Sequence, residues 1–271
     1  MGTGNVTVVG KRNYNGKNSE QFSIIANSLA TGTVSPIASK VYTGQPQLLT
    51  AKDLTITNSN GKRINASDID VAHIEYYLVE EDVDGDLISD ADGMFGYKIV
   101  DINKDQTIDN NDAIANPDNA GTYVVKIPLT GNYAGADALY QTYTIKPASI
   151  ATGYQFETGN NAKKDNFKTD YTGKIIKFSK DDLTVTQLDA EGEKTTKTLN
   201  YGTEFTVETP KDAREVGEYN GVVKGAGNYT GEIPFTFNVV KSLGDVDIAF
   251  DVEEKKSNNK VSYIYTPYTL V

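Results

Sequence analysis

Two acidic segments carry the residues of this chain whose types and spacing suit metal binding. A calcium loop gathers several oxygen ligands within a few residues, with carboxylates at its first, third and fifth positions and a closing ligand at its twelfth. The longer segment, 101–112, follows this spacing, and the shorter one, 82–90, repeats its first part. The candidate calcium ligands are Asp101, Asn103, Asp105, Thr107 through its backbone carbonyl, Asp109 and Asp112, with a second, lesser set at Asp82, Asp84, Asp86 and Asp90.

The longer segment resembles the calcium loops of EF-hands and dockerins, and Ile108 stands where those loops place an apolar residue. It departs from them at the sixth position, where glycine permits a sharp turn. Gln106 occupies that position here, Leu87 occupies it in the shorter segment, and Asp112 replaces the closing glutamate. We expect calcium as the only cofactor, with a dissociation constant of about 10⁻⁴–10⁻³ M. The alternative is a solvated acidic loop without an ion.

The residues required by most other site chemistries are missing. The chain has no cysteine, and its one histidine is His73. Zinc sites and Cys–His catalysis are therefore excluded. No nucleophile elbow, P-loop or dinucleotide fingerprint is found. The sequence predicts a protein that is not an enzyme; a hydrolase using paired carboxylates is the least favoured alternative. His73 lies in an alternating pattern over residues 71–77, which predicts a structural position on a strand.

Composition narrows the class of partner. Among 271 residues the formal net charge is -11, and the pI is about 4.7. An acidic surface repels nucleic acid and anionic lipid, so neither is expected as a partner. No apolar run is long enough for a membrane span, so no membrane insertion of this fragment is expected. The Met1-Gly2 start is typical of an internal fragment of a longer protein. We therefore expect a larger parent protein to supply export and anchoring.

Three short markers recur in the same order along the chain, which indicates tandem repeats. Most copies combine tyrosine or serine with glycine, between stretches that alternate as strands do, and the copy at 264–267 has proline in place of glycine. The first marker is at 28–32, 149–153 and 242–244, the second at 41–44, 170–173 and 264–267, and the third at 131–135, 227–231 and, at the front of the chain, 12–16. In the third marker, Asn and Gly tolerate positive φ and close a hairpin, while the tyrosine lays its ring across the hairpin with its hydroxyl near water.

The marker spacing predicts an all-β fold of tandem immunoglobulin-like sandwiches. A complete unit is about 93 residues, close to the size of such a sandwich. The first unit carries about 28 extra residues between Tyr77 and Asn119, the acidic insertion. A short joint at residues 146–148 predicts an elongated, semi-rigid rod. The predicted divisions are 1–27 (last strands of an upstream repeat), 28–148 (a repeat with the acidic insertion), 149–241 (a repeat) and 242–271 (the start of a further repeat).

The markers resemble the mostly-bacterial immunoglobulin-like (MBG-type) repeats of large surface proteins from Gram-positive and gut bacteria. The matching residues are the Tyr-Thr-Gly openings at 42–44 and 171–173, the Gly-x-Tyr strands at 121–123 and 217–219, and the Gly-Asn-Tyr turns. The resemblance covers nearly the whole chain. It implies a stalk, spacer or adhesive module and no catalytic residue. The acidic insertion departs from the family pattern.

Two further hypotheses concern particular side chains. Exposed tyrosines could form a carbohydrate-binding platform, although core or hairpin packing explains their repeated positions equally well, and tryptophan is absent. Some surface sandwiches also join lysine to asparagine in an intramolecular isopeptide bond beside a buried acid. Lysines in strand-like contexts are Lys40, Lys126, Lys174 and Lys224, and the sequence does not pair them with particular asparagines.

The sequence therefore predicts a non-catalytic structural or adhesive repeat region, a stalk or spacer, of an extracellular bacterial surface protein. Its expected location is the cell wall or cell surface. The expected partner is a host or matrix protein or a glycan, and the fragment is expected to be a monomer. The alternative function is a carbohydrate-binding module that uses exposed tyrosines.

Overall fold

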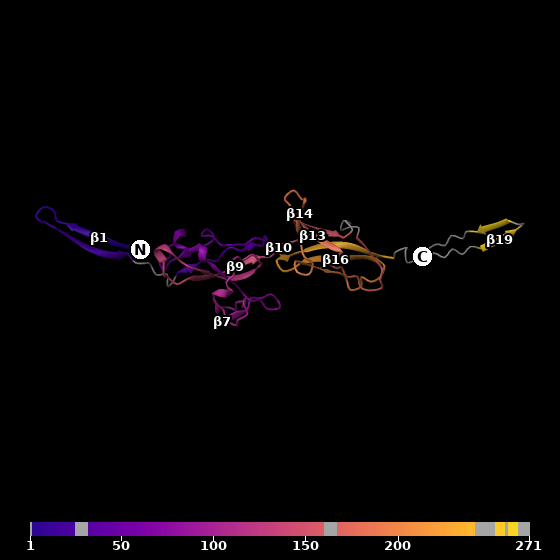
Figure 1. The fold of residues 1–271 in the computed structure, drawn as a ribbon, viewed down its shortest axis with the longest axis horizontal. Coiled ribbons are helices and arrows are strands. Elements are labelled where there is room, and N and C mark those ends of the chain that lie inside the picture. The colour runs from indigo at the N-terminus through magenta and orange to yellow at the C-terminus, as the bar shows by residue number, and fades with distance from the viewer. Residues whose placement is uncertain (1, 25–31, 160–166, 242–252, 258–259, 265–271) are drawn as a thin grey trace. The chain divides into compact units, whose positions relative to one another are not determined.

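The computed structural model describes residues 2–24, 32–159, 167–241, 253–257 and 260–264 (Figure 1). Regular structure in these ranges consists of β-strands and short 3₁₀-helices, which confirms the all-β prediction. No helix in the described part of the chain is both long and apolar enough for a membrane span. The markers at 28–31, 242–244 and 265–267 lie outside the described residues.

Contacts divide the chain into two units. The first comprises residues 1–152, 202–206 and 224–232, and the second comprises 153–201, 207–223 and 233–271. Two-stranded antiparallel hairpins occur near each end of the chain. Their strands are β1 (Gly2–Val9) with β2 (Lys17–Ile24), and β19 (Glu253–Ser257) with β20 (Lys260–Ile264).

The main sheet of the first unit has the order β4-β9-β8-β6. Strand β4 runs parallel to β9, and the other neighbours are antiparallel. A second, two-stranded sheet pairs β3 with β5. The bounds are β3 (Thr33–Val34), β4 (Lys40–Val41), β5 (Ile56–Thr57), β6 (Glu75–Leu78), β7 (Ser89–Met94), β8 (Gly121–Ile127) and β9 (Leu139–Lys146), with 3₁₀-helices η1 (Ala66–Asp68), η2 (Val71–His73), η3 (Asn110–Asp112) and η4 (Gly131–Tyr133).

Strand β8 is buried on both of its faces. Successive residues of a strand point to opposite sides of the sheet, and Tyr123, Val124 and Val125 are all buried. Tyr123 and Val125 belong to a large core that also contains Tyr76 and Tyr143. Val124 belongs to a smaller core with Tyr77, Val79 and Ile99, to which the acidic insertion contributes. The insertion thus covers the face of the sheet that lies opposite the main core.

The four-stranded sheet associated with the second unit has the order β12-β18-β16-β15, with β12 parallel to β18. A three-stranded sheet, β11-β13-β14, accompanies it. Phenylalanines fill this core, with Phe167, Phe178, Phe235 and Phe237 in mutual ring contact. The bounds are β11 (Tyr154–Thr158), β12 (Phe167–Asp170), β13 (Leu183–Leu188), β14 (Lys194–Thr198), β15 (Phe205–Glu208), β16 (Gly217–Gly225) and β18 (Glu232–Val240).

The two four-stranded sheets share their order and several hydrogen bonds. In each, the tyrosine after the parallel strand donates its backbone N–H to a residue of the neighbouring strand: Tyr42 to Lys146 and Tyr171 to Val240, both at 2.8 Å. In each Gly-x-Tyr strand the tyrosine hydroxyl donates to the carbonyl four residues earlier, from Tyr123 to Asn119 at 2.8 Å and from Tyr219 to Glu215 at 3.1 Å. A tyrosine that bonds back in this way is the tyrosine corner of immunoglobulin-like sandwiches.

The Gly-Asn-Tyr turns close hairpins, as the third marker predicts. Gly131 and Gly227 both have φ of +58°, in the left-handed region that glycine occupies without strain. The prediction for the tyrosine hydroxyl was wrong. Tyr133 and Tyr229 are buried, because each turn folds its ring inward to fill a core position. The Tyr133 hydroxyl lies 3.4 Å from the side-chain amide of Asn58.

The 224–232 segment belongs to the first unit through contacts at three places. Strand β10 (Ala148–Ser149) runs parallel to β17 (Tyr229–Thr230). The Asn228 side chain accepts from the Ala120 N–H at 2.7 Å and donates to the Asn119 side chain at 2.8 Å. The Tyr229 ring packs edge-on against Tyr42.

The expectation of a strand over residues 71–77 was wrong at its beginning. Residues Val71–His73 form η2, and β6 starts at Glu75. His73 is exposed and lies 2.9 Å from the carboxylate of Asp70, three residues earlier. This local pair is made within a helical turn, whose geometry brings residues three apart together.

We predict that Gly131→Ala destabilises the first unit by about 2–4 kcal/mol, because a β-carbon meets both an unfavourable φ and a close neighbour. A β-carbon at this position would clash with Oδ1 of the buried Asp68. The measurement is urea denaturation of the full chain. Gly135→Ala is the matched control: its φ is +84°, and nothing lies near the added atom. Equal losses for both variants would contradict the role of the Asp68 contact.

Candidate ion-binding insertion

The acidic insertion continues the chain beyond β6 as a small ladder. The Val79 N–H donates to Thr122 of β8, and the Val100 N–H donates back to Leu78. Between them, Glu80 bonds with Ile88 and Lys98. These bonds place both predicted calcium segments on one side of the main sheet, next to the smaller core.

The shorter segment forms a hairpin turn centred on one carboxylate. Asp82 Oδ1 accepts the backbone N–H groups of Asp84 and Asp86, at 2.9 and 3.0 Å. Gly85 has φ of +85°, which the turn requires. Asp90 lies apart from this turn on β7, where it accepts the N–H of Asp92 at 3.0 Å. Asp82, Asp84 and Asp86 thus share one turn, and Asp90 belongs to another element.

The first part of the longer segment is held by its own side chains. Both oxygens of Asp101 accept backbone N–H groups, from Lys104 at 2.6 Å and from Gln106 at 2.8 Å. Asn103 accepts the N–H of Asp105 and donates its amide to that carboxylate. Asp105 also accepts the N–H and hydroxyl of Thr107. These bonds lower the pKa of Asp105, with Thr107 making the largest contribution.

Asp112 joins the two ends of the longer segment. Its side chain is fully buried, and it accepts the N–H of Ile102 at 2.9 Å and that of Asp109 at 3.0 Å. Asp109 caps η3 by accepting the N–H of Asn111 at 2.7 Å. The reciprocal bonds of Asp109 and Asp112 form a capping box, which satisfies the free N–H groups at the start of a helix.

The backbone turns where a calcium loop carries glycine, although the sequence lacks glycine there. Lys104 and Gln106 have φ of 61° and 70°. The left-handed region costs about 1–2 kcal/mol for a residue with a β-carbon. The bonds to the two oxygens of Asp101 offset this strain by holding both N–H groups in place.

The predicted ligands are near one another in the chain but do not form a cage in this conformation. Their oxygens face backbone N–H groups, and no cluster of three or more histidine, aspartate or glutamate side chains suited to a metal ion occurs among the described residues. An oxygen that accepts one N–H keeps a further lone pair, so these bonds and calcium binding do not exclude each other. The calcium hypothesis therefore stays a prediction, and it concerns a loop that is already folded by hydrogen bonds.

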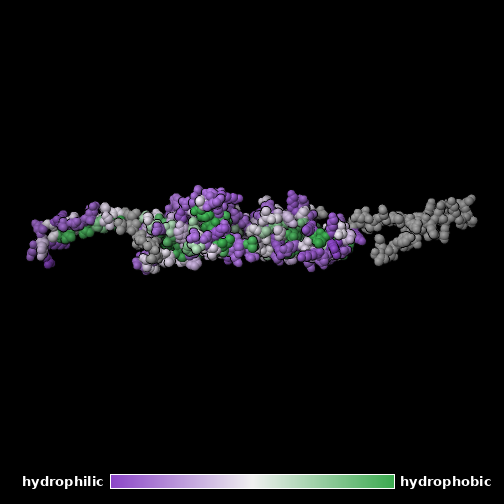
Figure 2. All heavy atoms as spheres, turned by 90° about the horizontal axis from the view of Figure 1, so that it is seen from below, coloured by the Kyte–Doolittle hydropathy of each residue, from purple (hydrophilic) through white to green (hydrophobic). Residues whose placement is uncertain are grey.

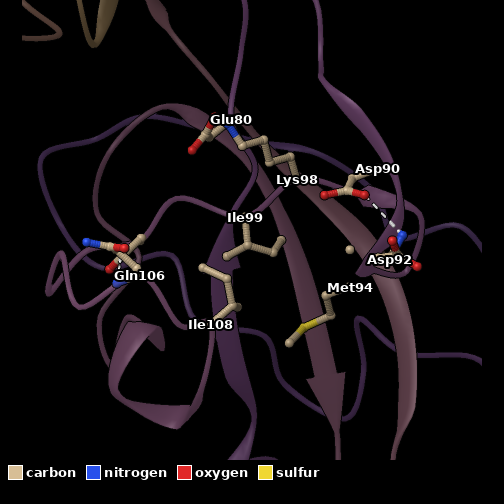
Figure 3. A pocket seen from close by; sticks show the side chains of 10 residues that line it. Glu80, Asp90, Asp92, Met94, Lys98, Ile99, Gln106 and Ile108 are labelled. Atoms are coloured by element: carbon tan, nitrogen blue, oxygen red, sulfur yellow. Dashed lines mark hydrogen bonds and ion pairs between the residues drawn. The ribbon is translucent and has the colours of Figure 1, made fainter.

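A pocket of about 480 Å³ lies beside the longer segment (Figure 3). In Figure 3, Ile99, Ile108 and Met94 occupy the middle of the view, with charged side chains around them. Lys98 pairs with Glu80 at 2.7 Å, and this bond is the main reason that the pKa of Lys98 is raised. The lining residues are Glu80, Asp90, Asp92, Gly93, Met94, Lys98, Ile99, Asp101, Gln106 and Ile108. With four carboxylates and one lysine, this pocket disfavours anionic ligands.

Sequence reasoning included Asp90 and Asp101 among its candidates but missed Glu80, Lys98 and Met94. The strand-favouring residues of 76–79 and 97–100 were the available signal for two paired strands that bring Glu80 to Lys98. Their pairing depends on the conformation of the long segment between them, which the local sequence pattern does not predict.

Hydrophilic residues dominate the molecular surface visible in Figure 2, which agrees with the high acidic content of the chain.

Comparison with known proteins shows no family for this chain. No protein-family model matches the chain, and no curated protein matches it. Among solved structures, it is similar to domains 4–9 of the surface layer protein SbsC, with 13% sequence identity and a TM-score of 0.20. The match covers 94% of this chain and 36% of that one. At this TM-score the similarity carries no argument about function.

Asp112→Ala is predicted to lower the free energy of unfolding by about 2–3 kcal/mol, since two partly buried hydrogen bonds to backbone N–H groups lose their acceptor. Denaturation in the presence of EDTA measures this effect without contribution from a bound ion. Asp84→Ala removes an exposed carboxylate elsewhere in the acidic insertion and is the control, with an expected change within about 0.5 kcal/mol. A similar small change for Asp112→Ala would show that its bonds contribute little.

If the longer segment binds calcium, millimolar calcium raises the melting temperature of the full chain and magnesium raises it less. A ligand at tenfold excess over its Kd stabilises a protein by about 1.4 kcal/mol. Asp101→Asn should abolish the increase because it removes the charge of the first ligand position, whereas Asp84→Asn in the shorter segment should leave it. An unchanged melting temperature in 10 mM calcium, about ten times the weakest expected Kd, would count against the site.

Proposed function

We propose that this chain is a non-catalytic repeat region of an extracellular bacterial surface protein, acting as a stalk or spacer with a structural or adhesive role. The observation that carries the proposal is the second occurrence of one sheet order, β4-β9-β8-β6 and β12-β18-β16-β15. A chain that forms the same sheet again further along gains length without a new fold. Spacers are built in this way, with contacts mainly between neighbouring units.

The markers that suggest MBG-type repeats have structural tasks, and this supports the proposal. The tyrosines of the Gly-x-Tyr strands form tyrosine corners, and the Gly-Asn-Tyr turns supply residues to cores. The positions that recur along the sequence are therefore explained by folding. We propose the cell wall or cell surface as the location, and a host or matrix protein or a glycan as the partner of any adhesive surface.

The tyrosines of the described residues bear on the carbohydrate-binding alternative. Those of the markers and strands are largely enclosed: Tyr76, Tyr77, Tyr123, Tyr133, Tyr143 and Tyr229 are all buried. A sugar-stacking platform needs rings that face solvent. Tyr14 and Tyr201 are exposed, but Tyr14 belongs to the turn between β1 and β2 and Tyr201 to the loop before β15, so the two come from different elements. These observations favour the structural role over glycan recognition, and a blank glycan array would agree with them.

Small-angle X-ray scattering tests the spacer proposal. A compact particle of 271 residues has a radius of gyration of about 18 Å. The rod expected from the sequence should give a clearly larger value at several protein concentrations, with a mass that fits a monomer. A radius near the compact value would contradict the spacer, and a concentration-dependent mass would contradict the monomer.

A further inference from the structure

Lys126, Glu75 and Asn110 meet on the outer face of the main sheet of the first unit. Lys126 and Glu75 are directly opposite each other on β8 and β6. The Lys126 amine lies 3.1 and 3.0 Å from the two Glu75 carboxylate oxygens. It also lies 3.4 Å from Oδ1 of Asn110, which reaches it from η3 in the acidic insertion. The Lys126 amine thus contacts a carboxylate and a carboxamide that come from two other elements.

A fourth group, the hydroxyl of Tyr77, completes the cluster. It contacts Glu75 and lies 3.2 Å from the same Oδ1 of Asn110. Tyr77 is buried, next to the smaller core. The Lys126 and Glu75 side chains keep 24% and 29% of their exposure. The ion pair between them is therefore partly shielded from water.

We propose that Lys126 and Asn110 form an intramolecular isopeptide bond, with Glu75 as the catalytic proton carrier. Glu75 takes a proton from the Lys126 ammonium, and the lone pair of the resulting amine forms a bond to Cγ of Asn110. The carbonyl electron pair moves to Oδ1, where the Tyr77 hydroxyl stabilises the developing charge by a hydrogen bond.

The second half of the reaction releases ammonia. Glu75 gives its proton to Nδ2 of Asn110, the carbonyl reforms, and the bond between Cγ and Nδ2 breaks. Glu75 then takes the second proton from Nζ and passes it to the departing ammonia. One lysine ammonium and one carboxamide become a secondary amide and an ammonium ion, and Glu75 ends as a carboxylate. No oxidant, metal or cofactor enters this balance.

An ordinary ion pair is the competing explanation for Lys126 and Glu75. Cross-strand Lys–Glu pairs are common on sheets and need no third partner. The distinguishing observation is Asn110, because it comes from the insertion and presents a carbonyl both to the amine and to a hydroxyl donor. Lys40, another lysine in a strand-like context, instead donates to the carbonyl of Leu48 and the carboxylate of Asp53.

The bond would fasten the acidic insertion to the sheet that it covers. Asn110 begins η3, two residues before Asp112, which holds both ends of the longer segment. Lys126 lies on β8, a central strand of the main sheet. A covalent link between them keeps the insertion in place even when the smaller core opens. Mechanical resistance of this kind suits an exported protein without disulfides.

Intact mass spectrometry of the purified full chain tests the proposal. The expected result is a mass lower than that of the unmodified sequence by one ammonia, about 17 Da. The deficit should disappear in Lys126→Arg, Asn110→Ala and Glu75→Gln. It should remain in Lys98→Arg, which alters the comparable Lys98–Glu80 ion pair. Asn110→Ala alters an exposed side chain, so its folding should be unaffected, and circular dichroism confirms this.

Peptide mapping locates the bond. A protease that cleaves before aspartate separates residues 109–111 from residues 118–136, and the proposed bond would hold these two peptides together. A full, unshifted mass would overturn the proposal. A deficit that persists in Lys126→Arg would also overturn it, because loss of ammonia by succinimide formation needs no lysine.

Discussion

The double-sided burial of β8 is the constraint on which the first unit depends. A strand with one wet face can tolerate many side chains on that face, but β8 has Tyr123 and Val125 in the main core and Val124 in the smaller one. Register along β8 is therefore fixed from both sides, since a slip by one residue would exchange the two sets of neighbours. The position of Lys126 opposite Glu75 follows from that register.

The insertion is folded mainly by its carboxylates. In a chain with net charge -11, packed aspartates repel one another unless each has a donor. Asp82, Asp101 and Asp112 each accept more than one backbone N–H. The same bonds satisfy backbone groups that lie outside regular strands. An acidic sequence can in this way form a defined surface.

The buried tyrosines show how a repeat pattern relates to structure. Tyr123 and Tyr219 occupy matching places in two sheets, and each hydroxyl bonds to a carbonyl four residues earlier. Recurrence of the Gly-Asn-Tyr marker indicated that the turn is important for folding, but it did not show whether the tyrosine ring faces water. Tyr133 and Tyr229 were expected to keep their hydroxyls near solvent and are buried instead. A hairpin pattern in the sequence predicts the turn, whereas the packing of neighbouring segments sets how much of the tyrosine side chain is exposed.

Local patterns in the amino-acid sequence were enough to predict the class of fold, the hairpins and the place of the acidic insertion. Strand alternation and turn residues such as Gly131 depend on only a few neighbouring residues. It also identified both acidic segments as unusual. Three features became visible only in the folded chain: Asp112 is buried, Glu80 pairs with Lys98, and Asn110 contacts Lys126. The physical reason is that these contacts depend on strand register and on how the insertion packs over the sheet, and both are set by interactions between segments far apart in the chain.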